Sequence, residues 1–145
     1  MTRTSRYRNV LLALHAGATG AVALAMLILS VAPPMFLKSG RPANFGLVVH
    51  IIAYGILCIL AGTWLHIAGK TSYPALYAAL FTSLYGLLIE CIQYGLLYRS
   101  FEINDILINC FTAAVAIIPC RVILHYVPVY KKPAESEGLT SRLMR

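Results

Sequence analysis

The chain has 145 residues, of which 59% are apolar and only 12% are charged. Soluble domains contain about 45–50% apolar and about 25% charged residues, and a chain of this length has too little interior to bury so many apolar side chains. Disordered segments and coiled coils are excluded because both need many more charges. The composition therefore indicates a membrane protein with helical spans of roughly 20 residues each.

The net charge of +7 does not indicate nucleic-acid binding. The 12 Lys and Arg residues form no patch; they lie at the chain ends and between apolar runs, as topology signals do. The cysteines all lie inside apolar runs, without a CxxC pair or a zinc spacing: Cys58, Cys91, Cys110 and Cys120. We therefore expect them to fill the core rather than to bind a metal.

Four apolar runs predict a single all-α membrane domain over residues 1–130, followed by a polar cytoplasmic tail over residues 131–145. The predicted spans are about residues 10–32, 45–68, 74–97 and 105–127. Pro33 and Pro34 end the first span, and Pro74 suits the first turn of the third. Asn104 is the expected N-cap of the fourth.

The distribution of Lys and Arg predicts how the spans are oriented. Eight lie on the side of both termini: Arg3, Arg6, Arg8, Lys70, Lys131, Lys132, Arg142 and Arg145. Three lie on the other side: Lys38, Arg41 and Arg99. The twelfth, Arg121, lies in the last two turns of the fourth span, and we expect it to extend toward the cytoplasmic face. Because cytoplasmic loops are enriched in positive charge, we expect an antiparallel four-helix transmembrane bundle with both termini in the cytoplasm (N-in/C-in).

Small residues recur at every fourth position, which places them on one helix face. In the first span this stripe consists of Ala13, Gly17, Ala21 and Ala25. Helices in lipid associate through such faces because small side chains let their backbones approach closely. We therefore expect the stripe to pack against the other spans.

Seven polar residues are expected to meet near the outer side of the membrane, and we call them the polar cluster. They are His50, Tyr54, Glu90, Gln93, Arg99, Asp105 and Asn109. The start of the second span, the end of the third and the start of the fourth share that side, so the topology alone brings them together. An unpaired carboxylate there is costly, so we expect Glu90 to be protonated or paired with His50 or Arg99.

Four blocks of the sequence carry a family resemblance. They are His50-Ile-Ile-Ala-Tyr54, Glu90-Cys-Ile-Gln93, Arg99-Ser-Phe101 and Asp105-Ile-Leu-Ile-Asn109. Their order and spacing over about residues 44–115 resemble the VanZ-like family of small bacterial integral membrane proteins. The resemblance implies a four-span protein of the bacterial inner (cytoplasmic) membrane, linked to the cell envelope and of the type associated with resistance to the antibiotic teicoplanin.

Two positions depart from the family pattern. Gly46-Leu47 stands where the family has an Asp-Lys pair before the histidine, and Thr112 stands where it has a glycine after the asparagine. The missing pair removes two charges that would order the cluster around His50. A family activity that uses those charges would therefore be lost or altered here.

We expect the polar cluster to bind an envelope component, which by the resemblance is a lipid-linked or cell-wall-related molecule. Seven polar groups are more than helix packing requires, and ionisable groups inside a membrane are functional candidates by default. Arg99 would meet an anionic headgroup, while Glu90 and His50 would form the charged core. The residues that would orient this core are Gln93, Asp105 and Asn109.

Three alternatives remain open. The first is a membrane enzyme that acts on a lipid headgroup and needs Glu90 or His50 for turnover, although no nucleophile motif accompanies them. The second is a small accessory subunit of a larger membrane complex. The third is a purely structural hydrogen-bond network. A metal site is disfavoured because the ligand types come from three helices with no local motif, and no cofactor is expected.

Overall fold

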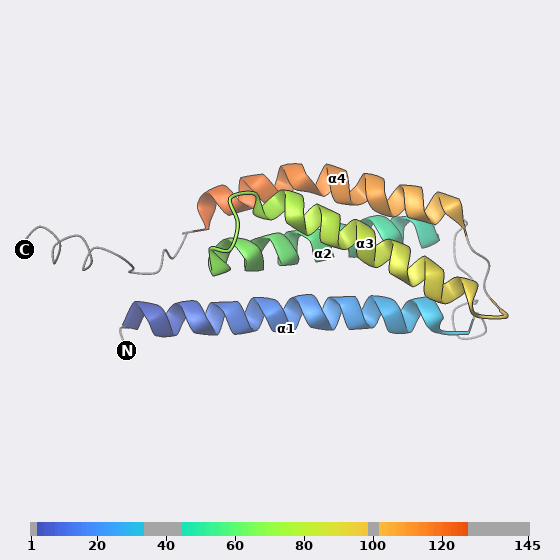
Figure 1. Cartoon of the computed structure of the whole chain (residues 1–145), viewed down its shortest axis with the longest axis horizontal. Coiled ribbons are helices and arrows are strands. Elements are labelled where there is room, and N and C mark those ends of the chain that lie inside the picture. Colours follow the sequence, from blue (N-terminus) through green and yellow to red (C-terminus); the bar gives the residue numbers. More distant parts are fainter. Residues whose placement is uncertain (1–2, 34–44, 99–101, 128–145) are drawn as a thin grey trace, which may run out of the picture.

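The computed structural model describes residues 3–33, 45–98 and 102–127, and this part of the chain is helical (Figure 1). The helices are α1 (Arg3–Val31), α2 (Phe45–Ala68), α3 (Pro74–Tyr94) and α4 (Ile103–Tyr126). They pack side by side as an antiparallel bundle, and each is long and apolar enough to cross a membrane. The all-α, four-span prediction is therefore confirmed. The predicted tail lies outside the described residues.

The turn between α2 and α3 shows how the sequence sets helix ends. Gly69 has a positive φ of 65°, which glycine adopts without steric cost, and its N–H donates to the carbonyl of His66 at 3.0 Å. Pro74 then occupies the first turn of α3, where its missing N–H leaves no bond unmade. The sequence thus closes α2 and opens α3 within a few residues.

Three helix ends differ from the expected limits. Helix α1 begins at Arg3, before the apolar run itself, and α3 ends at Tyr94 rather than near residue 97. The chain turns there because the N–H of Leu96 bonds the carbonyl of Gln93. Helix α4 begins at Ile103 with Glu102 as its N-cap, so the prediction that Asn104 caps it is wrong.

Helices α2, α3 and α4 pack closely through small side chains. Their core includes Cys58, Ala61, Ala78 and Ala113, and all four are buried. At Gly62 a Cβ atom would lie only 2.5 Å from the sulfur of Cys120, so no larger residue fits without a shift. Close packing of small residues, rather than large apolar ones, holds this part of the bundle together.

Two of the four cysteines do not fill the core. Cys58 and Cys120 are buried, as expected, whereas Cys91 and Cys110 are exposed on the outside of the bundle. The prediction is wrong for this second pair. Apolar runs include lipid-facing positions, and a cysteine is compatible with either environment.

Helix α1 packs on the others mainly through its second half. Met26 is buried against Tyr54, Leu57 and Ile89. The small-residue stripe does not take part: Ala13, Gly17, Ala21 and Ala25 are all exposed, so the expectation that it packs against the other spans is wrong. The face that carries Met26, nearly opposite the stripe at 3.6 residues per turn, is the one turned inward.

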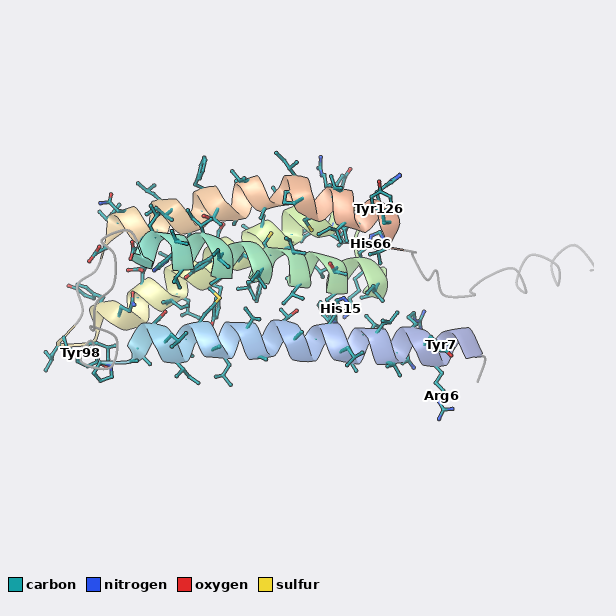
Figure 2. All side chains as sticks on the ribbon, turned by 180° about the vertical axis from the view of Figure 1, so that it is seen from behind. Arg6, Tyr7, His15, His66, Tyr98 and Tyr126 are labelled. Carbon is teal, nitrogen blue, oxygen red and sulfur yellow. The ribbon has the colours of Figure 1, made fainter. Side chains whose placement is uncertain are left out.

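The two ends of the bundle are formed by different helix ends and carry different polar residues. At one end, which we call the cluster end, α1 and α3 finish and α2 and α4 begin. Figure 2 shows Tyr98 there and shows His66 and Tyr126 at the opposite end. At the opposite end the Nε2 atom of His66 bonds the carbonyl of Val127 at 3.0 Å and so joins α2 to the end of α4.

Candidate functional site

The polar cluster is built around His50, which the second turn of α2 carries at the cluster end. Its Nδ1–H donates to the Oδ1 atom of Asn109 on α4 at 2.9 Å. Its Nε2 atom lies 3.9 Å from the Oδ2 atom of Asp105, one turn earlier on α4. Both ring nitrogens therefore face α4, and their partners lie on one face of that helix, as the spacing predicts.

Tyr54 supports the imidazole from within α2. Its ring stacks on that of His50 with the centroids 5.8 Å apart and the planes 9° from parallel. Tyr54 is only 3% exposed, whereas the side chains of His50 and Asp105 are 27% and 31% exposed. The histidine and the aspartate thus form the accessible rim of the cluster above a buried tyrosine.

Glu90 is the most deeply buried charged residue in the described part of the chain, at 1% exposure. Its Oε2 atom accepts a long bond of 3.5 Å from the N–H of Glu102, while its Oε1 atom is buried without a partner among the described residues. The alternative that pairs Glu90 with His50 is wrong, because both ring nitrogens of His50 are directed to α4. Arg99, the other expected partner, lies outside the described residues.

Gln93 is turned away from His50. Its Nε2 atom donates to the carbonyl of Ser30 on α1 at 3.0 Å, so it joins α3 to α1. Tyr98, just beyond α3, donates in the same way to the carbonyl of Val31 at 2.7 Å. The structure therefore brings together five of the seven predicted residues: His50, Tyr54, Glu90, Asp105 and Asn109.

Gly86 also belongs to the site, although it is not among the seven predicted residues. A Cβ atom there would lie 2.9 Å from Cε1 of Tyr54 and 3.1 Å from both Cβ and Nδ2 of Asn109. Only a glycine lets α2 and α4 approach α3 this closely. The signal was its i, i+4 spacing before Glu90, which places both on the same face of α3.

The arrangement is suited to hydrogen bonding rather than to metal binding. Within the described ranges no group of three His, Cys, Asp or Glu side chains is placed to hold a metal ion. Two buried polar atoms of the cluster have no partner in the same ranges, and they are complementary: Oε1 of Glu90 accepts a hydrogen bond, and Nδ2 of Asn109 donates one.

A protein-family model, that of VanZ/LLP1, matches residues 3–124 of the chain. The match includes α1, α2, α3 and nearly all of α4, and therefore the whole polar cluster. No curated protein and no solved structure matches the chain significantly.

Proposed function

The chain belongs to the VanZ/LLP1 family, and on this premise we propose that its polar cluster binds the headgroup of a lipid-linked or cell-wall-related envelope component. The protein would lie in the bacterial inner membrane with both termini in the cytoplasm and the cluster end outward. The excess of Lys and Arg near the termini supports this orientation.

The observation that carries the proposal is the pair of unpartnered atoms. Residues Glu90 and Asn109 are each 1% exposed, yet Oε1 of one and Nδ2 of the other bond to nothing among the described residues. A buried polar group without a partner costs about 1–3 kcal/mol. A ligand that supplied one donor and one acceptor would remove this cost, which gives binding a driving force.

The chemistry of the cluster favours a headgroup that carries both donors and acceptors. Hydroxyl, amide or amine groups of a sugar or peptide would donate to Glu90 and to the partly exposed Asp105. Carbonyl or phosphate oxygens would accept from Asn109, and an anionic group would meet Arg99. His50 is held by Asn109 and Tyr54 and would present its Nε2 atom at the rim.

A thermal unfolding experiment tests the proposal. The full chain is purified in detergent micelles and heated with and without a polyprenyl-linked sugar–peptide precursor, because a ligand that binds only the folded state raises the melting temperature. We expect the precursor to stabilise the natural chain and to stabilise Glu90→Gln much less. His125→Gln, which changes an exposed histidine at the opposite end, serves as the matched control and keeps the full effect.

Two outcomes would reject this function. One is the absence of stabilisation by the precursor, and the other is equal stabilisation of the natural chain and Glu90→Gln. Chemical conversion of the precursor during incubation, lost in Glu90→Gln, would favour the membrane enzyme. Stoichiometric co-purification of other membrane chains, unaffected by Glu90→Gln, would favour the accessory subunit.

A further inference from the structure

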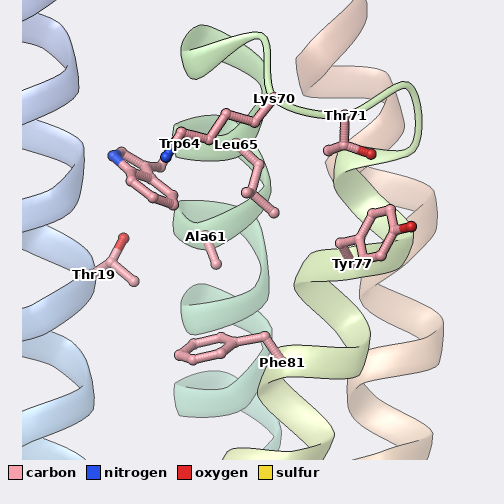
Figure 3. A pocket seen from close by; sticks show the side chains of 8 residues that line it. All are labelled: Thr19, Ala61, Trp64, Leu65, Lys70, Thr71, Tyr77 and Phe81. Atoms are coloured by element: carbon pink, nitrogen blue, oxygen red, sulfur yellow. The ribbon is translucent and has the colours of Figure 1, made fainter.

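A cavity of about 470 Å³ lies between α1, α2 and α3, away from the polar cluster (Figure 3). Its walls include Thr19 of α1, Trp64 and Leu65 of α2, and Phe81 of α3. Trp64 lies 14 residues after His50 on the same helix, which is roughly 21 Å at 1.5 Å per residue. The cavity is therefore a separate feature, and its volume is in the range of small-molecule sites, about 300–1,000 Å³.

The cavity exists because α1 contacts its neighbours unevenly. Val22, Ala23, Met26 and Leu27 pack against α2 and α3 at the cluster end, whereas no described residue from the first half of α1 belongs to a buried apolar cluster. The residue that faces the gap from α1 is Thr19, and its hydroxyl already donates to its own helix at the carbonyl of His15. Since this hydroxyl is satisfied, the walls favour an apolar occupant.

The opposite end of the bundle, which the cavity reaches at Lys70 and Thr71, carries the complementary charge for an anionic headgroup. Lys70 lines the cavity, and its Nζ atom lies 5.5 Å from the centroid of the Trp64 ring. The acidic side chains in the described ranges all belong to the cluster end: Glu90, Glu102 and Asp105. The basic ones whose side chains are described belong to the opposite end: Arg6, Arg8, Lys70 and Arg121.

Arg8 adds a second positive charge on the α1 side. It lies 11 residues before Thr19, which is three helical turns, so both residues occupy the same face of α1. Arg8 is partly buried, and its Nε atom has no partner within the described ranges. Long basic side chains of this kind extend along a helix toward the membrane surface, where phosphate groups lie.

We propose that this cavity holds an acyl chain of an anionic phospholipid whose phosphate is bound by Lys70. All four helices have the length and composition of membrane spans, so the gap between α1 and its neighbours is open to acyl chains. The apolar walls take the chain, and the cationic end of the bundle selects the headgroup. The lipid would fill the space that α1 leaves and would so complete the packing of this helix.

Trp64 provides a direct test because it is the sole tryptophan of the chain and lines the cavity. The full chain is reconstituted in phosphatidylcholine vesicles that contain a fixed share of phosphatidylglycerol, with bromine atoms on the acyl chains of one lipid or the other. Bromine quenches tryptophan fluorescence on contact. The quantity compared is the fluorescence intensity of each variant in brominated vesicles, divided by that of the same variant in unbrominated vesicles. This ratio cancels the effect of Lys70 on the fluorescence of the Trp64 indole.

We expect brominated phosphatidylglycerol to quench Trp64 more than its share of the vesicle lipid predicts, as if this lipid were enriched about fivefold at the cavity. A fivefold ratio corresponds to about 1 kcal/mol, the contribution of one basic residue near an anionic membrane surface. Lys70→Gln should remove most of the enrichment, and Arg6→Gln, at an exposed arginine of the same end, should retain it. Thr19→Phe, which fills the cavity, should reduce quenching by both lipids.

Equal quenching by the two brominated lipids in the natural chain would overturn the proposed selection of an anionic headgroup. Quenching that Thr19→Phe leaves unchanged would show that the acyl chains contact Trp64 from elsewhere and would overturn the site itself. Enrichment that persists in Lys70→Gln would remove the role of that residue. None of these results depends on the ligand of the polar cluster.

Discussion

Helix α1 and the group of α2, α3 and α4 both contain glycines, but only the group of three has glycines at close contacts between helices. Gly62 and Gly86 lie where neighbouring helices come so close that a Cβ atom would collide. At Gly17 and Gly20 of α1 a Cβ atom would meet nothing within 4 Å in the described part of the chain. A small residue in a membrane helix is therefore a packing requirement only where a partner helix reaches it.

The largest effect is expected at Gly86. Gly86→Leu would displace the ring of Tyr54 and the side chain of Asn109 together, and it should lower the free energy of unfolding by about 3 kcal/mol. Denaturation by SDS in mixed micelles measures this change. Gly55→Leu, at a glycine of α2 with open space around it, is the matched control. Similar losses in both variants would show that the close approach at Gly86 is not what matters.

A substitution at Gly62 should lower the free energy of unfolding by a smaller amount, and a second substitution at Cys120 should restore most of it. Gly62→Ala would place a methyl group 2.5 Å from the sulfur of Cys120, and overpacking of this kind costs about 1–3 kcal/mol. In a Cys120→Ala background the obstructing sulfur is absent, so most of the loss should disappear in the same SDS titration. A loss that persists in the double variant would contradict the contact.

Removal of a single hydrogen bond that attaches α1 should lower the free energy of unfolding by still less. Tyr85 and Gln93 donate to the carbonyls of Ala23 and Ser30, and interhelical hydrogen bonds in membranes average about 0.6 kcal/mol. Tyr85→Phe and Gln93→Leu should therefore each lower the free energy of unfolding by about that amount. Tyr7→Phe, at an exposed tyrosine of α1, should change nothing, and an equal loss there would refute the assignment.

The smallest effect is expected on the exposed stripe. Gly17→Ala and Gly20→Ala should leave the free energy of unfolding within about 0.5 kcal/mol of that of the natural chain, as is usual for surface substitutions. The same SDS titration, carried out at low protein concentration, measures this. A loss comparable to that of Gly62→Ala would mean that α1 packs closely through this face and would invalidate the contrast between the two regions.

The sequence is sufficient to predict the spans because the bilayer fixes how long an apolar run must be. It is also sufficient to bring His50, Asp105 and Asn109 together, since an antiparallel order places the start of α2 beside the start of α4. Both predictions depend on lengths and directions along the helix axes, which a single sequence contains.

Predictions that depend on how a helix is rotated about its axis succeed less well. Ala21 and Met26 lie on nearly opposite faces of α1 at 3.6 residues per turn, and the small-residue pattern favours the wrong face. The imidazole of His50 is within reach of more than one helix, and its partners on α4, rather than Glu90, decide its orientation. Such choices depend on the shape of the facing surface, which is built from residues distant in the sequence.

The bonds that attach α1 at the cluster end have a consequence for how its sequence can vary. Each of these bonds has a side-chain donor from Tyr85, Gln93 or Tyr98. The acceptors on α1 are the backbone carbonyl oxygens of Ala23, Ser30 and Val31, respectively. Every residue type has such an oxygen, so replacing these three side chains of α1 does not delete the acceptors. These three hydrogen bonds therefore tolerate any side chain at their α1 positions, whereas each depends on the particular donor side chain that the neighbouring segment supplies.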